Sequence, residues 1–535
     1  MSHPTPAADA EHGIDPEIYQ RRWQILGVLC TSLMIVIIGN TALNVALPRL
    51  AADLQASTTD LQWMVDSYAL IFACLLFTAG TLGDRFGRKG ALQGGLVLFL
   101  IGTVAASVAT SSTGVIVARG IMGVAAAFVM PSTLSLLTNV FPRAEQPKAI
   151  AVWAGISGGG AAVGPVASGF LLEHFWWGSV FLVNVPVIAL ALVLGHRLVP
   201  TSKDPAEPAL DVVGALLSIA GLGTLVYAII EAPIHGWGST STITTFALAF
   251  IFITLFALWE LRVEEPMLDL RYFKDMRFTA ASGGMTMIFF AMFGTFFLTA
   301  QYFQLVLGYS ALETGLFQLP MAFVMMLVSP QVPRLINRFG PARIVPIGLA
   351  LVATGLFTFS FLGVGTAIWW AYIPIFCLAF GMAFSMTPMT TMIMSAVPVT
   401  KAGVGSAMND TTRELGGALG VAALGSVVTS TYVGALGSAT EGLSAQQRAL
   451  AESGLTGAYQ VAEQLGERGL ALIAAAQQAF VDGLGNAALI GAGIIVVVAG
   501  VIRLSLTRNP IDAAVLARGE HGPLEDPQIE VTPVD

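Results

Sequence analysis

The sequence predicts an all-α integral membrane protein that crosses the bilayer fourteen times. Of its 535 residues, 55% are hydrophobic and only 11% are charged, whereas a soluble domain has about 25% charged residues. The apolar residues also gather into runs of about 20, the length that spans a bilayer core as a helix. The apolar surplus is therefore expected to face lipid.

Fourteen apolar runs along the chain have the length of a membrane-crossing helix. The first run follows Arg21 and Arg22, after a polar and acidic stretch, whereas a cleaved signal peptide has its basic and apolar parts at the very start. We therefore expect the first span to remain in the mature protein. The spans are predicted near residues 23–47, 61–82, 90–110, 113–137, 149–172, 178–198, 210–231, 242–261, 279–305, 312–332, 343–363, 369–394, 402–430 and 485–506.

Lysine and arginine are distributed unevenly between the two sides of these spans. Arg49, Arg448 and Arg468 fall on one side and two arginines fall within spans, which leaves 20 of the 25 basic residues on the side of the termini. Cytoplasmic loops are enriched in Lys and Arg. The pattern predicts that both termini are cytoplasmic, and the architecture fits a bacterial plasma membrane.

A faint internal repeat divides the membrane part into two halves. Arg85-Phe-Gly87 follows the second span and Arg338-Phe-Gly340 follows the tenth, each in a short basic turn. Two related six-helix bundles with spans seven and eight inserted between them would give this pattern. The predicted parts are a cytoplasmic tail 1–22, an N-terminal bundle 23–198, the inserted pair with its flanking loops 199–278, a C-terminal bundle 279–506 with an external loop 431–484, and a cytoplasmic tail 507–535.

The turn after the second span carries the most specific pattern in the chain. Glycines let two helix ends approach, Asp84 can accept hydrogen bonds at a following helix N-terminus, and basic residues fix the turn on the cytoplasmic side. A turn that only obeys the charge rule would explain the basic residues but not the glycines and the aspartate. The pattern predicts a gating turn made of Gly80, Gly83, Asp84, Arg85, Gly87, Arg88 and Lys89.

Small residues recur every four positions in the fifth span, at Gly160, Gly164 and Ser168. Such a stripe lets a neighbouring helix come close, and Pro165 is expected to bend the helix within it. The alternative is ordinary tight packing, because small residues at this spacing are common in membrane helices.

Ionisable residues inside the spans are candidates for function, because a charge in hydrocarbon costs about 2.5 to 3.5 kcal/mol even on the insertion scale. The candidates are Asp66 in span two, Arg119 in span four, and Asp410, Arg413 and Glu414 in span thirteen. The last three share one helix face, so Asp410 and Arg413 could neutralise each other and leave Glu414 as the more available proton site. The alternatives are an interfacial Asp66, an Arg119 that bonds helix ends, and a structural charge cluster in span thirteen.

Together these patterns resemble those of the major facilitator superfamily. The turn from Gly80 to Leu92 resembles its cytoplasmic signature, "VARGIMGVAAA" in span four resembles its fourth-helix motif, and "GGGAAVGPVASGF" in span five resembles its antiporter motif. "NTALNVALP" in span one and "AGVGSAMNDTTRELGGALGVAALGS" in span thirteen narrow the resemblance to the fourteen-helix drug:proton antiporters. The resemblance covers residues 23–506.

The resemblance implies two bundles that rock about a central cavity and export amphipathic, often cationic drugs in exchange for protons. It makes Asp66 and Glu414 the expected proton carriers, with Arg119, Asp410 and Arg413 beside them. At the place where the family has an acid before Asn-Thr in span one, this chain has Gly39. The antiporter motif maps onto Gly160, Gly164, Pro165 and Gly169.

Aromatic and methionine side chains beside buried carboxylates would suit a cationic, amphipathic cargo. For the phenylalanines and methionines the alternative is plain helix packing. The candidate cavity residues are Asn40, Asn44, Tyr68, Phe289, Phe290, Phe293, Met382 and Met386.

No pattern for catalysis, metal binding or nucleic-acid binding competes with this prediction. The six histidines are scattered without HExxH spacing, the three cysteines lack CxxC spacing, and there is no GxxxxGK[ST] phosphate loop. We expect no metal and no cofactor other than a proton gradient, no nucleic-acid partner, and a monomer. The remaining alternatives are a dedicated exporter of one metabolite, antibiotic or lipid, and a membrane-embedded enzyme or receptor.

Overall fold

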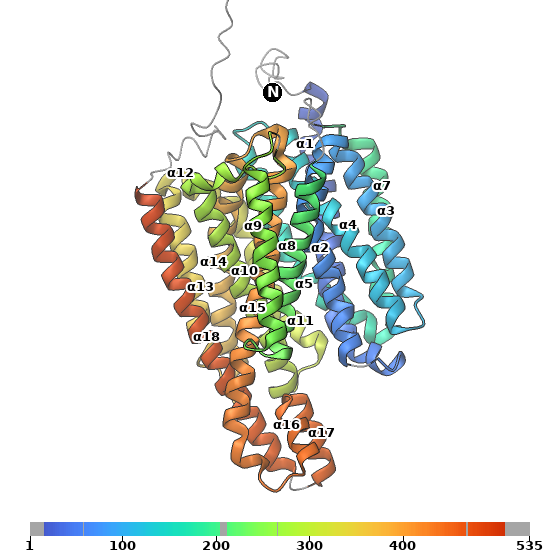
Figure 1. The fold of residues 1–535 in the computed structure, drawn as a ribbon, viewed down its shortest axis with the longest axis vertical. Helices are drawn as coiled ribbons and strands as arrows, with labels where there is room; N and C mark the ends of the chain where they lie inside the picture. Colours follow the sequence, from blue (N-terminus) through green and yellow to red (C-terminus); the bar gives the residue numbers. More distant parts are fainter. Residues whose placement is uncertain (1–14, 57, 204–210, 265, 467–468, 509–535) are drawn as a thin grey trace, which may run out of the picture.

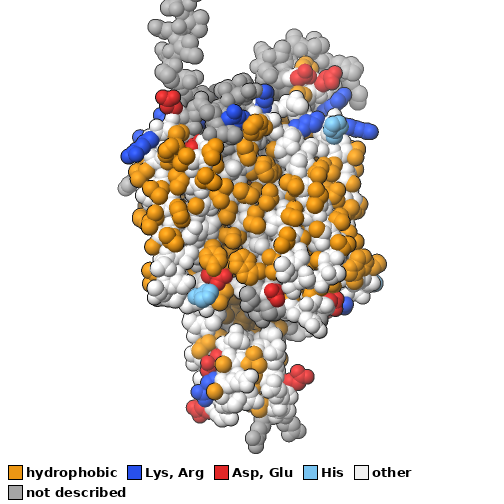
Figure 2. All heavy atoms as spheres, turned by 45° about the vertical axis from the view of Figure 1, so that its right-hand side comes forward, with side chains coloured by type: hydrophobic (Ala, Val, Ile, Leu, Met, Phe, Trp, Pro, Cys, Tyr) orange, Lys and Arg blue, Asp and Glu red, His pale blue; other side chains and the backbone are white. Residues whose placement is uncertain are grey.

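A computed structural model describes residues 15–56, 58–203, 211–264, 266–466 and 469–508. Within these ranges the regular structure is entirely helical, and fourteen helical segments are long and apolar enough to cross a membrane, one for each predicted span. Figure 2 shows hydrophobic side chains in a wide belt between two ends that carry the charged side chains. The predicted fold class is thus confirmed. Residues 1–14 and 509–535 of the predicted tails lie outside the described residues.

The first seven helices pack with one another on one side of the molecule (Figure 1). Within this N-terminal bundle, α4 packs against α2 and α3, while α1 packs against α5 and α7. The sixth predicted span is divided by a short irregular step between α6 and α7. The helices are α1 Pro16–Asp53, α2 Thr58–Phe86, α3 Arg88–Ser107, α4 Ser112–Val140, α5 Gln146–His174, α6 Ser179–Leu182 and α7 Asn184–Leu198.

The C-terminal bundle lies beside the N-terminal one and is built around α10 and α15, which pack closely along their length (Figure 1). Its helices are α10 Met276–Gln301, α11 Ala311–Val328, α12 Val332–Phe339, α13 Pro341–Phe359, α14 Ile368–Ser395, α15 Ala402–Leu436 and α18 Gly469–Arg508. Short turns join them: the 3-10 helices η2 Leu270–Lys274, η4 Ser329–Gln331 and η5 Val399–Lys401, and the π-helix η3 Tyr302–Val306.

The inserted pair, α8 Val212–His235 and α9 Thr240–Glu260, lies across the boundary between the two bundles (Figure 1). Helix α8 contacts α2 of one bundle and α15 of the other, and α9 packs mainly on α8. Most of the large apolar side chains of α9 are exposed, among them Phe250 at 73%, as expected for a helix that faces lipid. The pair is therefore peripheral, with α8 as its contact to the transport core.

Both ends of the described chain lie at one end of the molecule, which we call the terminal side (Figure 1). At the opposite end, the hairpin side, α15 and α18 run on beyond the belt and carry η6 Gly437–Thr440, α16 Ala445–Glu452 and α17 Leu455–Leu465. Tyr432 Oη donates to the Ala451 carbonyl oxygen at 3.0 Å, and Gln477 Nε2 donates to Tyr459 Oη at 2.7 Å. Side-chain bonds thus hold this extension together.

Two helices begin well before their predicted spans. Helix α1 begins at Pro16, inside the predicted tail 1–22, because Asp15 accepts a bond from Glu17 N at 2.8 Å and Pro16 occupies the first turn. Helix α18 begins at Gly469, not near 485, and so occupies part of the predicted loop 431–484. Its first turns are rich in alanine, which favours helix without being apolar enough to count as membrane span.

The internal repeat has a structural counterpart in two glycines. Gly87 has φ +117° between α2 and α3, and Gly340 has φ +77° between α12 and α13. A side chain with Cβ is strained at such φ values, so glycine is required for these sharp turns. The Arg-Phe-Gly sequences thus form the same backbone turn in both bundles.

Candidate functional site

A small cavity lies between the two bundles, with a volume of about 50 Å³. Drug-sized ligands occupy pockets of about 300–1,000 Å³, so the bundles must separate before such a molecule can enter. The cavity is lined by Val36, Ile37, Asn40, Thr41, Tyr68, Phe72, Met130, Ser157, Gly158, Phe289, Met292, Phe293, Met382, Met386, Arg413 and Glu414.

Six of the eight predicted cavity residues line this space: Asn40, Tyr68, Phe289, Phe293, Met382 and Met386. Phe290 does not, because the cavity face of α10 carries residues 289, 292 and 293, while the backbone of Phe290 lies against Gly420 of α15. The side chain of Asn44 lies outside the described part of the chain. A phenylalanine or methionine that lines the cavity can pack against neighbouring helices and also contact a cargo molecule.

Arg413 on α15 connects the two bundles within the cavity wall. Its Nη2 donates to Ser157 Oγ of α5 at 2.6 Å, and its Nη1 lies 3.5 Å from Asp410 Oδ1. The guanidinium also lies over the rings of Phe289, at 4.7 Å, and Trp153, at 5.5 Å. The charge is therefore compensated by a carboxylate and two aromatic faces.

Asp410 is 1% exposed and is not among the residues that line the cavity. Asn409 Nδ2 donates to its Oδ1 at 3.3 Å, and Asn409 Oδ1 in turn accepts from Thr390 Oγ1 of α14 at 3.1 Å. This chain of bonds supports the predicted pairing of Asp410 with Arg413 and its attachment to the C-terminal bundle.

Glu414, one residue after Arg413, is half-buried and lines the cavity. No hydrogen bond to its carboxyl is found among the described residues, and it is the acidic residue in the lining of the cavity. The predicted contrast between a paired Asp410 and an available Glu414 agrees with this geometry.

Arg119 on α4 is fully buried behind the cavity wall. Its Nε donates to the Met64 carbonyl oxygen at 3.0 Å, its Nη1 donates to that of Gly39 at 2.8 Å, and it lies 4.3 Å above the Tyr68 ring. These partners belong to α1 and α2, so Arg119 joins three helices of the N-terminal bundle. The alternative left open by the sequence was bonding to helix ends, whereas these carbonyl oxygens lie within α1 and α2.

Asp66 is not brought together with Glu414. Three residues earlier on the same face of α2, Trp63 lies 6.4 Å from the ring of Tyr227 on α8, so this face points to the seam between α2 and α8. One turn after Tyr227, Glu231 Oε2 lies 3.0 Å from His235 Nδ1. Asp66 thus lies beside the inserted helix, outside the wall of the central cavity.

Gly39, which stands where the family has an acid, does not face the cavity. A Cβ there would lie 2.7 Å from the Phe99 ring and 3.4 Å from Met122 Cε, between α3 and α4. The position has no room for a larger side chain in this state.

Sequence reasoning missed several wall residues, among them Ile37, Phe72, Met130, Ser157 and Met292. Ser157 could have been suspected, because it is a polar residue within an apolar span that carries a glycine stripe. The apolar ones could not, because nothing in a lone sequence separates cavity-facing from core-facing Phe and Met.

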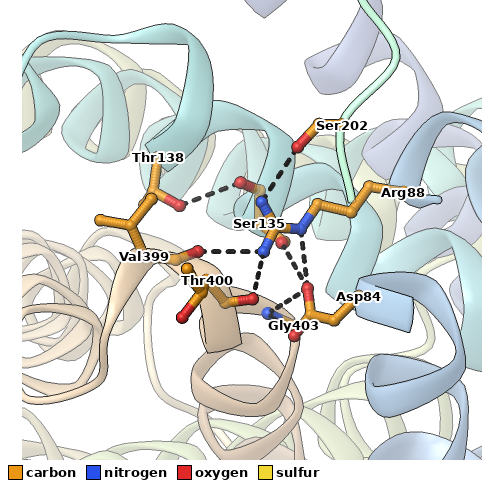
Figure 3. Close-up of polar contacts among 8 residues, drawn as sticks. All are labelled: Asp84, Arg88, Ser135, Thr138, Ser202, Val399, Thr400 and Gly403. Carbon is orange, nitrogen blue, oxygen red and sulfur yellow. Dashed lines mark hydrogen bonds and ion pairs between the residues drawn. The ribbon is translucent and has the colours of Figure 1, made fainter. Parts of the chain in front are cut away.

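The predicted gating turn forms a polar connection between the bundles on the terminal side (Figure 3). Asp84 Oδ1 lies 2.7 Å from Arg88 Nε, and Asp84 Oδ2 accepts from the backbone N of Gly403 on α15 at 2.8 Å. Arg88 Nη2 donates to the carbonyl oxygens of Val399 and Thr400 at 2.9 and 2.8 Å. We call these five residues the terminal gate. Both charged side chains are buried, so the bonds form away from water.

The other residues of the turn support the gate in different ways. A Cβ at Gly80 would lie 2.7 Å from the Gly403 carbonyl oxygen, so Gly80 allows α2 and α15 to touch. Gly83 lies against Ala91, and Lys89 Nζ donates to the His196 carbonyl oxygen at 2.8 Å, within the N-terminal bundle. Arg85 lies 5.3 Å over the Phe86 ring.

The small residues of α5 form two faces with different partners. Gly160, Gly164 and Ser168 face α1, where Ser168 Oγ donates to the Ala42 carbonyl oxygen at 2.7 Å. The predicted close approach is thus a contact inside the N-terminal bundle.

The second face of α5 packs against α11 of the other bundle. A Cβ at Gly169 would lie 3.0 Å from Leu312 Cα, and one at Gly315 would lie 3.1 Å from Val166 N, next to Pro165. We call these five residues the hairpin-side contact. Together with the terminal gate it joins the two bundles on both sides of the cavity.

The comparisons with known proteins agree with this architecture. The profile of the Major Facilitator Superfamily matches residues 29–421, most of the membrane part. The chain belongs to this superfamily. Among solved structures, a bacterial homologue of the human lysosomal transporter Spinster, in an inward-facing and unoccupied conformation, aligns with 95% of this chain and 99% of its own at a TM-score of 0.58. At 18% identity, that likeness supports the fold alone.

Curated relatives of this superfamily member cover between 76% and 91% of the chain. The multidrug efflux pump LfrA of Mycolicibacterium smegmatis is 36% identical over 91% of this chain and 97% of its own length. The methyl viologen resistance protein SmvA of Salmonella typhimurium is 32% identical over 86% and 93%. The tetracenomycin C resistance and export protein of Streptomyces glaucescens is 33% identical over 76% of each chain.

Proposed function

We propose that this protein exports amphipathic, often cationic drugs and other toxic compounds by alternating access, driven by the entry of protons. The observation that carries the proposal is an available carboxyl, Glu414, in an aromatic and methionine-lined cavity between two bundles that contact each other on both sides of it. The full-length similarity to LfrA and SmvA supports a drug-like cargo.

We infer that Glu414 is the main proton carrier. A desolvated carboxyl favours its neutral form, so it can take a proton from the acidic side and release it when the cavity opens to the other side. Cargo that carries positive charge would compete with the proton for the same carboxylate, which gives exchange. Asp410 is less available to a proton or a cargo, because its carboxyl lies 3.5 Å from the Arg413 guanidinium and is buried outside the cavity lining.

We further propose that the terminal side faces the cytoplasm and that the membrane is the plasma membrane. The loops of the terminal side carry most of the Lys and Arg residues, which supports this orientation through the positive-inside rule. No catalytic constellation or cofactor is part of the proposal, because the energy comes from the proton gradient.

The test is transport of methyl viologen and a panel of cationic dyes in inverted vesicles or proteoliposomes with an imposed pH gradient. Glu414→Gln keeps the shape and removes the titration, so uphill export should fall by roughly tenfold or more while downhill exchange partly survives. Glu313→Gln is the matched control, because Glu313 is a capping carboxyl on α11, away from the cavity. Asp66→Asn should have a weaker effect, since Asp66 lies outside the cavity wall.

Undiminished proton-driven export in Glu414→Gln would contradict the assignment of Glu414 as proton carrier and move this role to Asp410 or Asp66.

A narrower second candidate is a dedicated exporter of one compound, favoured by the similarity to a tetracenomycin C export protein. The breadth of the transported panel separates the two proposals, and chemical change of the cargo would argue for an enzyme.

A further inference from the structure

Two carboxyl groups face each other at the terminal side of the inserted pair, far along the chain from the cavity residues. Asp211 precedes α8 and caps it: its Oδ1 accepts from Gly214 N at 2.7 Å and from Trp259 Nε1 of α9 at 2.8 Å. Its Oδ2 is buried and has no hydrogen-bond partner in the described part of the chain. Asp211 Oδ1 thus accepts two hydrogen bonds, whereas Oδ2 accepts none from the described residues.

Glu260, the last residue of α9, has the same asymmetry. Its Oε2 accepts from the backbone N of Leu268 at 3.0 Å, whereas its Oε1 is buried without a partner among the described residues. The side chain is 3% exposed, so water does not supply the missing bond from bulk solvent. A buried acceptor left unpaired is costly, which calls for an explanation.

The two oxygens without a hydrogen-bond partner, Asp211 Oδ2 and Glu260 Oε1, lie close to each other. A Cβ built on Gly214 would contact both Asp211 Oδ2 and Glu260 Oε1, so both lie over the same backbone position. The carboxyls are within hydrogen-bonding reach of each other. Two ionised carboxylates at this separation repel strongly, whereas one shared proton turns the repulsion into a hydrogen bond.

Among the described residues, no neighbouring charged group compensates the two carboxylates. Besides Asp211, the groups that act on the Glu260 carboxyl are the backbone N–H groups of Met267 and Leu268. In the linker, Asp269 pairs with Arg271 at 2.9 Å, and Arg262 and Glu264 are exposed.

Among the described basic residues of the neighbouring elements, none is found to act on the Glu260 carboxyl. Arg88 on α3 pairs with Asp84 in the gate, and Arg85 lies over the Phe86 ring. Lys401, just before α15, acts on Asp269. Since no described residue donates a hydrogen bond to these two oxygens, a proton shared between them is the simplest partner.

We propose that Asp211 and Glu260 share one proton and form a second proton-binding site, outside the transport cavity. The pair loses this proton when the pH on the terminal side rises. Because both carboxyls also bind structural groups, the shared proton joins the start of α8, the end of α9 and the linker to α10.

This site is placed to act on the terminal gate through the linker. Met267 and Leu268 are buried in the core, and Asp269 follows directly and lies within electrostatic reach of Lys401. Lys401 ends η5, whose residues Val399 and Thr400 accept the bonds of Arg88. Loss of the proton would leave two anions side by side, release the linker and weaken that end of the gate.

A bound metal cation explains the pair less well. Hard cations take about six or more oxygen ligands, and here only two carboxylate oxygens are unoccupied. A shared proton is bound to one oxygen and hydrogen-bonded to a second, and the two carboxylate oxygens can fill these two roles.

The experiment uses the full chain in lipid nanodiscs and follows amide hydrogen exchange of the segment 266–270, corrected for intrinsic rates, from pH 5 to 9. Leu268 N is bonded to Glu260, so its protection reports whether the linker is held. Protection in the unaltered protein should fall by about tenfold per pH unit above the release point of the proton. Infrared spectra in the same range should lose one neutral carboxylic acid band.

The variants are Glu260→Gln and Asp211→Asn, in which an amide NH₂ replaces the shared proton as donor. Both should keep the linker protected and remove its pH dependence to within about twofold, together with the infrared band. Glu264→Gln, an exposed carboxyl in the same linker, is the matched control and should behave like the unaltered protein. If one variant fails to fold, the other gives the same readout.

Protection that is independent of pH in the unaltered protein, or a pH dependence that persists in both variants, would overturn the proposal. Protection that rises with added Na⁺, Mg²⁺ or Ca²⁺ and falls with a chelator would overturn it in favour of a cation site. Neither readout uses transport, so these outcomes are separate from failure of Glu414 as proton carrier.

Discussion

The two contacts that join the bundles on either side of the cavity are built from different interactions. The terminal gate is polar: one buried ion pair, Asp84 with Arg88, bonds to three backbone groups of the other bundle. The hairpin-side contact is apolar, with Gly169 and Gly315 letting α5 and α11 pack backbone to backbone. Charge-assisted bonds are directional and are lost together when one partner is removed, whereas packing is spread over many atoms. The terminal gate is therefore the more sensitive to a single substitution.

The largest effect is expected for Asp84→Asn. The substitution removes the charge that holds Arg88 and Gly403 N, and bonds to charged groups contribute about 1.5–3 kcal/mol each, so the closed terminal side should lose roughly tenfold or more in population. Spin-label distances between the terminal ends of α2 and α15 should lengthen, and transport should fall at normal protein levels. Glu145→Gln is the control, because that carboxyl pairs with Arg22 at 2.7 Å within one bundle. Unchanged spin-label distances and an unchanged transport rate would show that the turn connects α2 and α3 without acting as a gate.

Gly169→Leu should have a smaller effect on the hairpin-side contact. A bulky side chain against the Leu312 backbone overpacks the hairpin-side contact at a cost of about 1–3 kcal/mol, part of which the helices can relieve by shifting. Transport should slow several-fold, and labels on the hairpin ends of α5 and α11 should move apart while those at the terminal gate do not.

Gly164→Leu sharpens this comparison, because Gly164 belongs to the α1 face of α5. It should lower the thermal stability of the N-terminal bundle and leave no separate change in hairpin-side distances. If Gly164→Leu lengthens the hairpin-side distances between α5 and α11 as Gly169→Leu does, the contact of α5 with α1 is coupled to its contact with α11.

The smallest effect is expected for Arg338→Gln in the repeated turn of the C-terminal bundle. Arg338 is exposed and lies 5.2 Å over the ring of its neighbour Phe339, in contrast to the buried Arg88. Exposed substitutions change stability by less than about 0.5 kcal/mol, so transport should stay within about twofold. A loss as large as that of Asp84→Asn would show that both turns gate.

The sequence predicted the individual helices well because hydrophobicity over about 20 residues depends only on the local chain. It also separated Asp410 from Glu414, because their spacing from Arg413 is fixed by helix geometry. It failed for the beginning of α18, where alanine-rich helix continues beyond the membrane, and for Phe290, which shares its span with three cavity residues but points along another face.

The sequence by itself determined the fold class, the number of spans and the sharp glycine turns at Gly87 and Gly340. It also showed that ionisable residues lie inside the spans, where a charge is energetically costly. These depend on hydropathy, φ angles and spacing within one helix. Only the tertiary structure decided which partners those residues meet: Asp84 with Gly403, Arg413 with Ser157, and Asp211 with Glu260. The members of the first two pairs are more than 200 residues apart, and those of the third belong to different helices, so their contacts arise from the packing of whole helices, which no local pattern encodes.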